Sequence, residues 1–183
     1  TGPLDVFMTG LKVSFLISIL TACPVWIYQF WQFIKPALHM HEKRSVKPFI
    51  FVSIFLFFTG VSFSYYIILP LTLSFLIQLG LEVGQPMITI TDYVSMLSLL
   101  LIGFGLVFEV PLLLVLLAYL EVLSVEKLVQ VRRYVILIIL ILAAIMTPPD
   151  PLSQIGMAIP LYIMYELSIM IIYLSEKKRE VRE

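Results

Sequence analysis

The chain has 183 residues, with 12 Lys or Arg and 12 Asp or Glu, so its formal net charge is zero. Hydrophobic residues make up 61% of the sequence and the mean hydropathy is +1.05, which is more apolar surface than one soluble core of this size buries. The composition therefore excludes a soluble globular domain and predicts a lipid bilayer around the chain. The lack of a basic excess argues against nucleic acid as a partner.

Five apolar blocks follow one another along the chain, and each is interpreted as a membrane span. A helix needs about 20 residues to cross roughly 30 Å of hydrocarbon. The expected spans cover residues 11–30, 49–69, 93–118, 134–147 and 152–174. The fourth is only about 14 residues long, a length more typical of a re-entrant or buried helix. We interpret it as a span because basic residues precede it and also follow the fifth block, which places those ends on one side.

Basic residues alternate with the apolar blocks and predict the orientation of the chain. Eleven of the twelve Lys and Arg residues fall in three segments, whereas residues 69–91 and 147–152 contain none. By the positive-inside rule the basic segments are cytoplasmic, so the start of the chain is outside and its carboxyl terminus is inside. Residues 1–10 and 70–92 are then outer segments, the second with short helical potential at 71–79. We predict an all-α protein, a single membrane domain over residues 1–183.

Prolines interrupt almost every expected span, at Pro24, Pro70, Pro111 and Pro160. Each lacks a backbone N–H and kinks its helix, which a membrane protein tolerates where neighbouring groups satisfy the freed carbonyl. We expect bent helices around a concavity. Kinks that serve packing alone are the alternative.

Two acidic residues lie deep in the expected spans. Glu109 is about 14 Å and Glu166 about 12 Å from the inner end of its span, at 1.5 Å per residue. A carboxylate at such depth costs on the order of 2.5 to 3.5 kcal/mol on insertion scales and is usually retained for a partner, a polar cavity or a proton path. The alternative is a protonated acid hydrogen-bonded to a neighbouring helix.

The first expected inner segment combines aromatic residues with an acid among bases. The aromatic residues are expected to form an interfacial belt. They are Tyr28, Phe30, Trp31 and Phe33. Glu42 is followed by Lys43 and Arg44, so a local ion pair worth less than about 1 kcal/mol is one interpretation. His39 and His41 would point to different faces of a helix, so no metal site is expected.

A polar cluster precedes the fifth expected span. Asp150 occupies the position of a helix N-cap if the span begins near Pro151, and capping alone would explain it. Gln154 follows four residues later, so the two side chains could share a face. Gln154 would alternatively hydrogen-bond to a neighbouring helix.

Four runs of residues in this sequence, in this order and at these separations, resemble the TatC subunit family of the twin-arginine protein translocase. They are YQFWQFIKPAL at 28–38, HEKR at 41–44, FGLVFEVP at 104–111 and TPPDPLSQ at 147–154. The resemblance extends from about Thr1 to Leu174. Family members have six spans and an inner amino-terminal tail that contributes to recognition. Thr1 to Phe7 aligns with the outer loop after the first span, so the first span and the tail are expected to be missing here.

The resemblance implies a function. TatC-like proteins are non-enzymatic and need no cofactor. They recognise the consecutive arginines in signal peptides of folded cargo and recruit TatB-like and TatA-like single-span subunits. The proton gradient then drives export across the inner (cytoplasmic) membrane, where TatC-like subunits also meet other copies of themselves. By motif, Glu42 and Phe33 would belong to the signal-peptide site.

The resemblance also implies roles for the polar residues inside the membrane. Glu109 would be the acid on the concave side, and Asp150 with Gln154 the outer-end polar pair of the partner-helix site. Glu166 is a further candidate for an intramembrane partner contact. The competing interpretation is a small proton-coupled secondary transporter, or a permease fragment, with Glu109 and Glu166 as carriers, although the chain lacks an internal repeat. An intramembrane enzyme has less support, because the spans contain no Ser/His, Asp/Asp or metal-ligand set.

Overall fold

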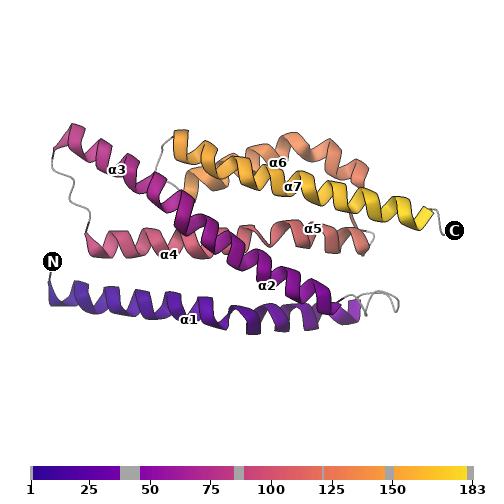
Figure 1. The fold of residues 1–183 in the computed structure, drawn as a ribbon, viewed down its shortest axis with the longest axis horizontal. Helices are drawn as coiled ribbons and strands as arrows, with labels where there is room; N and C mark the ends of the chain where they lie inside the picture. Colours follow the sequence, from indigo (N-terminus) through magenta and orange to yellow (C-terminus); the bar gives the residue numbers. More distant parts are fainter. Residues whose placement is uncertain (1, 38–45, 85–88, 121, 147–150, 181–183) are drawn as a thin grey trace.

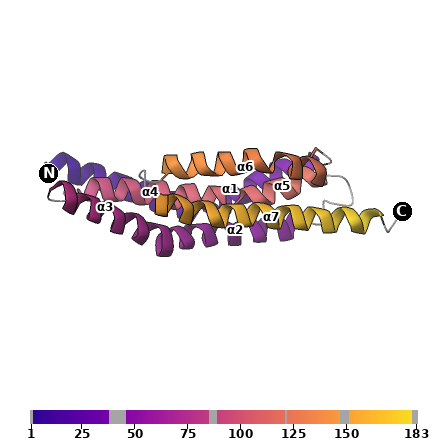
Figure 2. The same cartoon turned by 90° about the horizontal axis from the view of Figure 1, so that it is seen from above.

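The structure is a computed structural model, described for residues 2–37, 46–84, 89–120, 122–146 and 151–180. Its helices run along one long axis, as Figures 1 and 2 show. They are α1 (Pro3–Ile34), the 3₁₀ turn η1 (Lys35–Ala37), α2 (Val46–Phe63), the π-helix η3 (Ser64–Ile68), α3 (Leu69–Val83), α4 (Ile90–Val107), α5 (Val110–Tyr119), α6 (Val125–Met146) and α7 (Pro151–Glu180).

The described residues contain five stretches long and apolar enough to cross a membrane. They are Leu4–Ile34, Pro48–Leu81, Ile90–Tyr119, Val125–Met146 and Gln154–Ser175. The predicted all-α fold with five transmembrane helices is therefore confirmed.

Both segments that the sequence placed outside the membrane contain helix. The short helical potential expected at 71–79 falls within a longer helix, whereas no helix was predicted for residues 1–10. The first helix begins at Pro3, since a proline at the first helical position loses no hydrogen bond and Asp5 accepts one from the Gly2 amide at 3.1 Å. Residues 69–83 form α3 directly after η3, with Pro70 at the start of α3. The wider π turn accommodates the missing proline donor, so α2, η3 and α3 form one continuous rod.

The fourth span is also longer than predicted. Helix α6 has 22 residues and begins at Val125, nine residues before the predicted start. The predicted span began directly after the basic pair Arg132 and Arg133, because the continuous apolar pattern begins there. The helix passes through this charged segment, in which Arg132 pairs with Glu166 on α7, and it reaches full membrane-spanning length.

The third span is interrupted where the sequence predicts a kink. Helix α4 ends at Val107 and α5 starts at Val110, with Phe108 and Glu109 between them. Pro111 has no N–H, so the carbonyl of Val107 cannot receive the usual helical bond from it. At this interruption the Glu109 amide donates to the Leu106 carbonyl, three residues back, at 3.1 Å. Glu109 therefore lies at the break between α4 and α5.

Helix α2 packs closely against α4 through two glycines. A Cβ on Gly60 would lie 2.7 Å from the Phe104 carbonyl oxygen, and one on Gly105 would lie 2.5 Å from the ring of Phe57. Each helix thus contributes a glycine at the crossing, which brings the two backbones together in the manner of small-residue membrane interfaces. Figure 1 shows α2 crossing the α4–α5 rod obliquely. The crossing brings α2 beside the break that holds Glu109.

Candidate functional site

Glu109 forms a polar site with Ser53 between α2 and the α4–α5 break. The Ser53 hydroxyl donates to the Oε2 atom of Glu109 at 2.5 Å, and Ser53 is only 1% exposed. The Oε1 atom of Glu109 is buried and has no hydrogen-bond partner among the described residues. One carboxyl oxygen is therefore satisfied and the other retains its capacity to accept or donate a hydrogen bond.

The surroundings of this site are apolar. Phe57 lies one turn after Ser53 on α2, and Leu112 lies three residues after Glu109. Both belong to a buried cluster in which α1 contributes Cys23, Ile27 and Trp31. A polar group in such surroundings is costly unless it is hydrogen-bonded. The hydrogen bond from Ser53 therefore offsets part of the cost of burying the Glu109 carboxyl group.

Glu166 has a separate set of partners. Its Oε2 accepts from Arg132 Nη2 at 2.8 Å, and its Oε1 accepts from the Tyr162 hydroxyl at 2.8 Å. The Arg132 and Glu166 side chains are 41% and 33% exposed, so the pair lies at a partly open surface between α6 and α7. Glu109 bonds toward α2, whereas Glu166 bonds toward α6. The structure thus assigns the two acids to different helix pairs.

Gln154 lies in the first turn of α7 and reaches across to α6. Its Nε2 donates to the Leu140 carbonyl at 3.1 Å, which is the contact with a neighbouring helix that the sequence suggested as an alternative. Asp150, its predicted companion, lies outside the described residues, as does Glu42.

Three of the four aromatic residues predicted to form an interfacial belt are exposed. Phe33 is 81% exposed near the end of α1, and Tyr28 and Phe30 are also exposed. Trp31 was wrongly assigned to the belt: it is 2% exposed and its ring lies 5.3 Å from that of Phe49. Helical periodicity turns Trp31 toward α2 while Phe33 faces outward. The exposed Phe33 stands directly before the segment that contains Glu42.

Sequence reasoning missed three of the residues that hold the acids. Ser53 and Tyr162 are ordinary residues of apolar helices, and Arg132 was interpreted as part of a loop. Tyr162 could have been found, because it precedes Glu166 by one helical turn. Ser53 is 56 positions from Glu109, and no local pattern connects them. Among the described residues no group of three or more His, Cys, Asp or Glu is placed to hold a metal ion.

These features define a multi-pass helical membrane protein with an acidic residue held inside a broken transmembrane helix. The family model described as Sec-independent protein translocase protein (TatC) matches residues 1–160. A protein of that name from Desulforapulum autotrophicum is 43% identical over 183 residues, covering 100% of this chain and 68% of the relative. One from Aquifex aeolicus is 39% identical, covering 100% of this chain and 77% of the relative.

Solved structures agree with the sequence comparison. A crystal structure of the twin arginine translocase receptor TatC in DDM is 40% identical, with a TM-score of 0.80, and the match covers 93% of this chain and 75% of that one. A second TatC crystal structure is 39% identical with the same TM-score, covering 96% of this chain and 76% of that one. The chain belongs to the TatC family of Sec-independent protein translocase subunits, which is not a family of enzymes. The family resemblance found from the four motifs is thus confirmed.

Proposed function

We propose that this protein is the subunit of the twin-arginine translocation system that recognises twin-arginine signal peptides and recruits TatA-like and TatB-like single-span subunits. Export of folded cargo then follows, driven by the proton gradient. The observation that carries the proposal is family membership together with an acid, Glu109, held at a helix break inside the membrane. A translocase subunit implies partner subunits and cargo.

The proposed orientation places the recognition surface in the cytoplasm of the cell. Figure 1 shows the end of α1, the start of α2, the end of α5, the start of α6 and the end of α7 at one end of the molecule. Of the Lys and Arg residues that the structure describes, all but Lys12 lie in the elements that meet at this end. The positive-inside rule therefore supports a cytoplasmic position for it in the inner membrane.

Signal-peptide recognition is assigned to Glu42 and Phe33. A guanidinium group binds a carboxylate through two parallel hydrogen bonds, so an acid is the natural receptor for a signal-peptide arginine. Phe33, nine residues before Glu42 in the sequence, exposes 81% of its surface and offers an apolar face to the peptide. In this proposal Glu42 accepts one arginine while Phe33 packs against the neighbouring peptide residues.

Partner recruitment is assigned to Glu109, with Asp150 and Gln154 nearer the outer end. Glu109 has one oxygen atom without a partner among the described residues, so a polar group on an incoming helix can satisfy it. The Glu109 side chain is half-buried, so the helix break lies close to the surface of the bundle. Glu166 has two partners already, so we assign it a supporting role at the α6–α7 contact.

Photo-crosslinking to a twin-arginine precursor tests the recognition site. Glu42→Ala is expected to reduce crosslinking sharply, whereas Glu126→Ala, which removes an acid from the first turn of α6, is the matched control. A precursor with lysines in place of the two arginines should crosslink weakly to every variant. Undiminished crosslinking to Glu42→Ala would remove Glu42 from the site.

Export assays test the role of Glu109. Glu109→Ala should abolish export or the co-purification of single-span subunits while the protein still inserts into the membrane, and Glu126→Ala should export normally. Normal export by Glu109→Ala would refute the assignment. The transporter alternative uses Glu109 and Glu166 together, yet each has its own partners on a different helix pair. Uptake of a small solute into vesicles containing the purified protein would support that alternative instead.

A further inference from the structure

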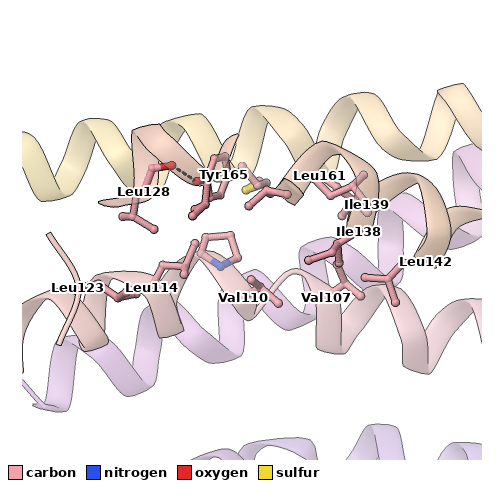
Figure 3. A pocket seen from close by; sticks show the side chains of 14 residues that line it. Val107, Val110, Leu114, Leu123, Leu128, Ile138, Ile139, Leu142, Leu161 and Tyr165 are labelled. Carbon is pink, nitrogen blue, oxygen red and sulfur yellow. Dashed lines mark hydrogen bonds between the residues drawn. The ribbon is translucent and has the colours of Figure 1, made fainter. Parts of the chain in front are cut away.

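An apolar cleft of about 400 Å³ separates the α4–α5 rod from α6, with α7 as its floor. Helix α6 contributes a stripe of side chains from Leu128 to Leu142, so the cleft is about 21 Å long at 1.5 Å per residue. Figure 3 shows Val110 and Leu114 on one side of the space, opposite Leu128 and Tyr165 on the other. The cleft is therefore long and narrow and runs along the helices.

The chemistry of the cleft fits hydrocarbon. All of its lining side chains are apolar except that of Tyr165, and the Tyr165 hydroxyl already donates to the Leu128 carbonyl at 2.7 Å. No lining side chain is thus left to bind a polar ligand. A helix is about 10 Å across, so a segment of partner helix as long as the cleft needs on the order of 1,500 Å³. The cleft is therefore too small to enclose a helix along its length, whereas a thin flexible chain fits within it.

A cation stands at one end of this stripe. Lys127 lies four residues before Val131, one of the lining residues, so it shares a face of α6 with the apolar stripe and directly precedes Leu128, where the stripe begins. Lys127 is exposed, and a side chain in a helix leans toward the helix amino terminus, here away from the bilayer centre. On the opposite flank Arg132 is already paired with Glu166. Lys127 is therefore placed to meet a negative charge at the membrane surface.

We propose that the cleft binds one acyl chain of an anionic phospholipid from the leaflet at the Val125 end of α6, with the lipid phosphate beside Lys127. The acyl chain fills the apolar space between α5 and α6, and Lys127 selects for negative charge. Arg133 is engaged elsewhere, because its guanidinium lies 4.8 Å from the centre of the Tyr134 ring and donates to the Tyr134 hydroxyl.

Native mass spectrometry of the purified protein tests the site with phosphatidylglycerol and phosphatidylcholine of identical acyl chains. The protein should retain one phosphatidylglycerol about fivefold more tightly than phosphatidylcholine, the preference expected for one surface cation. Lys127→Gln should bind both lipids equally. Ile138→Trp, which fills the cleft from a position 54% exposed, should lose both lipids.

Leu137→Trp is the matched control, since it adds the same bulk to α6 at a 56% exposed position outside the cleft. This variant should bind lipid like the unmodified protein. Retention of phosphatidylglycerol by Ile138→Trp, or equal binding of the two lipids by the unmodified protein, would overturn the proposal. A photo-crosslinker at position 138 that captures a single-span subunit in place of lipid would also overturn it.

Discussion

The hydrogen bond between Ser53 and Glu109 gives the sharpest test of the intramembrane site. Ser53→Ala removes the 2.5 Å bond and leaves a buried carboxyl group with neither oxygen partnered among the described residues. Losing one partner of a buried polar group typically costs about 1–3 kcal/mol. Because Ser53 is 1% exposed, water does not replace the lost bond, and we expect a loss within that range.

The assay is denaturant unfolding of the purified protein in micelles, with Ser168→Ala as the control. Ser168 is also fully buried, but its hydroxyl bonds to the Met164 carbonyl one turn back in its own helix, so its removal leaves no distant group unpaired. In a double-mutant cycle, Ser53→Ala should cost much less once Glu109 is replaced by Ala. Equal destabilisation by Ser53→Ala and Ser168→Ala, or full additivity with Glu109→Ala, would refute the reasoning.

Two further predictions concern helix contacts. Gly60→Ala should lower the free energy of unfolding by about 1–3 kcal/mol in the same assay, because its methyl group would meet the Phe104 carbonyl oxygen at 2.7 Å. Gly10→Ala, with no atom within 4 Å, should be neutral or stabilising. Equal effects of the two substitutions would argue against the close helix crossing. Arg132→Gln should lower the free energy of unfolding by at most about 1 kcal/mol, because both partners of its ion pair are partly exposed. Adding Glu166→Gln should recover most of that loss. A double variant no more stable than Arg132→Gln would count against the pairing.

The number and order of the spans were predictable from the sequence, because hydropathy and the positions of basic residues are local signals. The helix ends were less predictable. Pro70 was interpreted as the start of a loop, but a π turn absorbs its missing donor. Arg132 was interpreted as a loop residue, but it lies within α6 and pairs with Glu166 on α7. Both corrections depend on bonds that the apolar pattern does not encode.

The candidate site was predictable as a set of residue types and not as a geometry. Glu109 was identified because an acid in an apolar span is costly. Its partner Ser53 was invisible, since a serine in a membrane helix usually bonds to its own backbone. The separation of Glu109 from Glu166 depends on which face each helix turns to its neighbours, and a single sequence with kinked helices does not fix those faces.

In the proposed function, the surface around Phe33 receives the arginine pair of a signal peptide in the cytoplasm. The most direct measurement is photo-crosslinking in intact cells from position 33 to an export precursor, with position 7 at the opposite end of α1 as the comparison. Crosslinks from position 33 should disappear when the two arginines become lysines, and none should form from position 7 before export begins. Crosslinks from position 33 that persist without the arginines, or that form from position 7 instead, would contradict the proposed function.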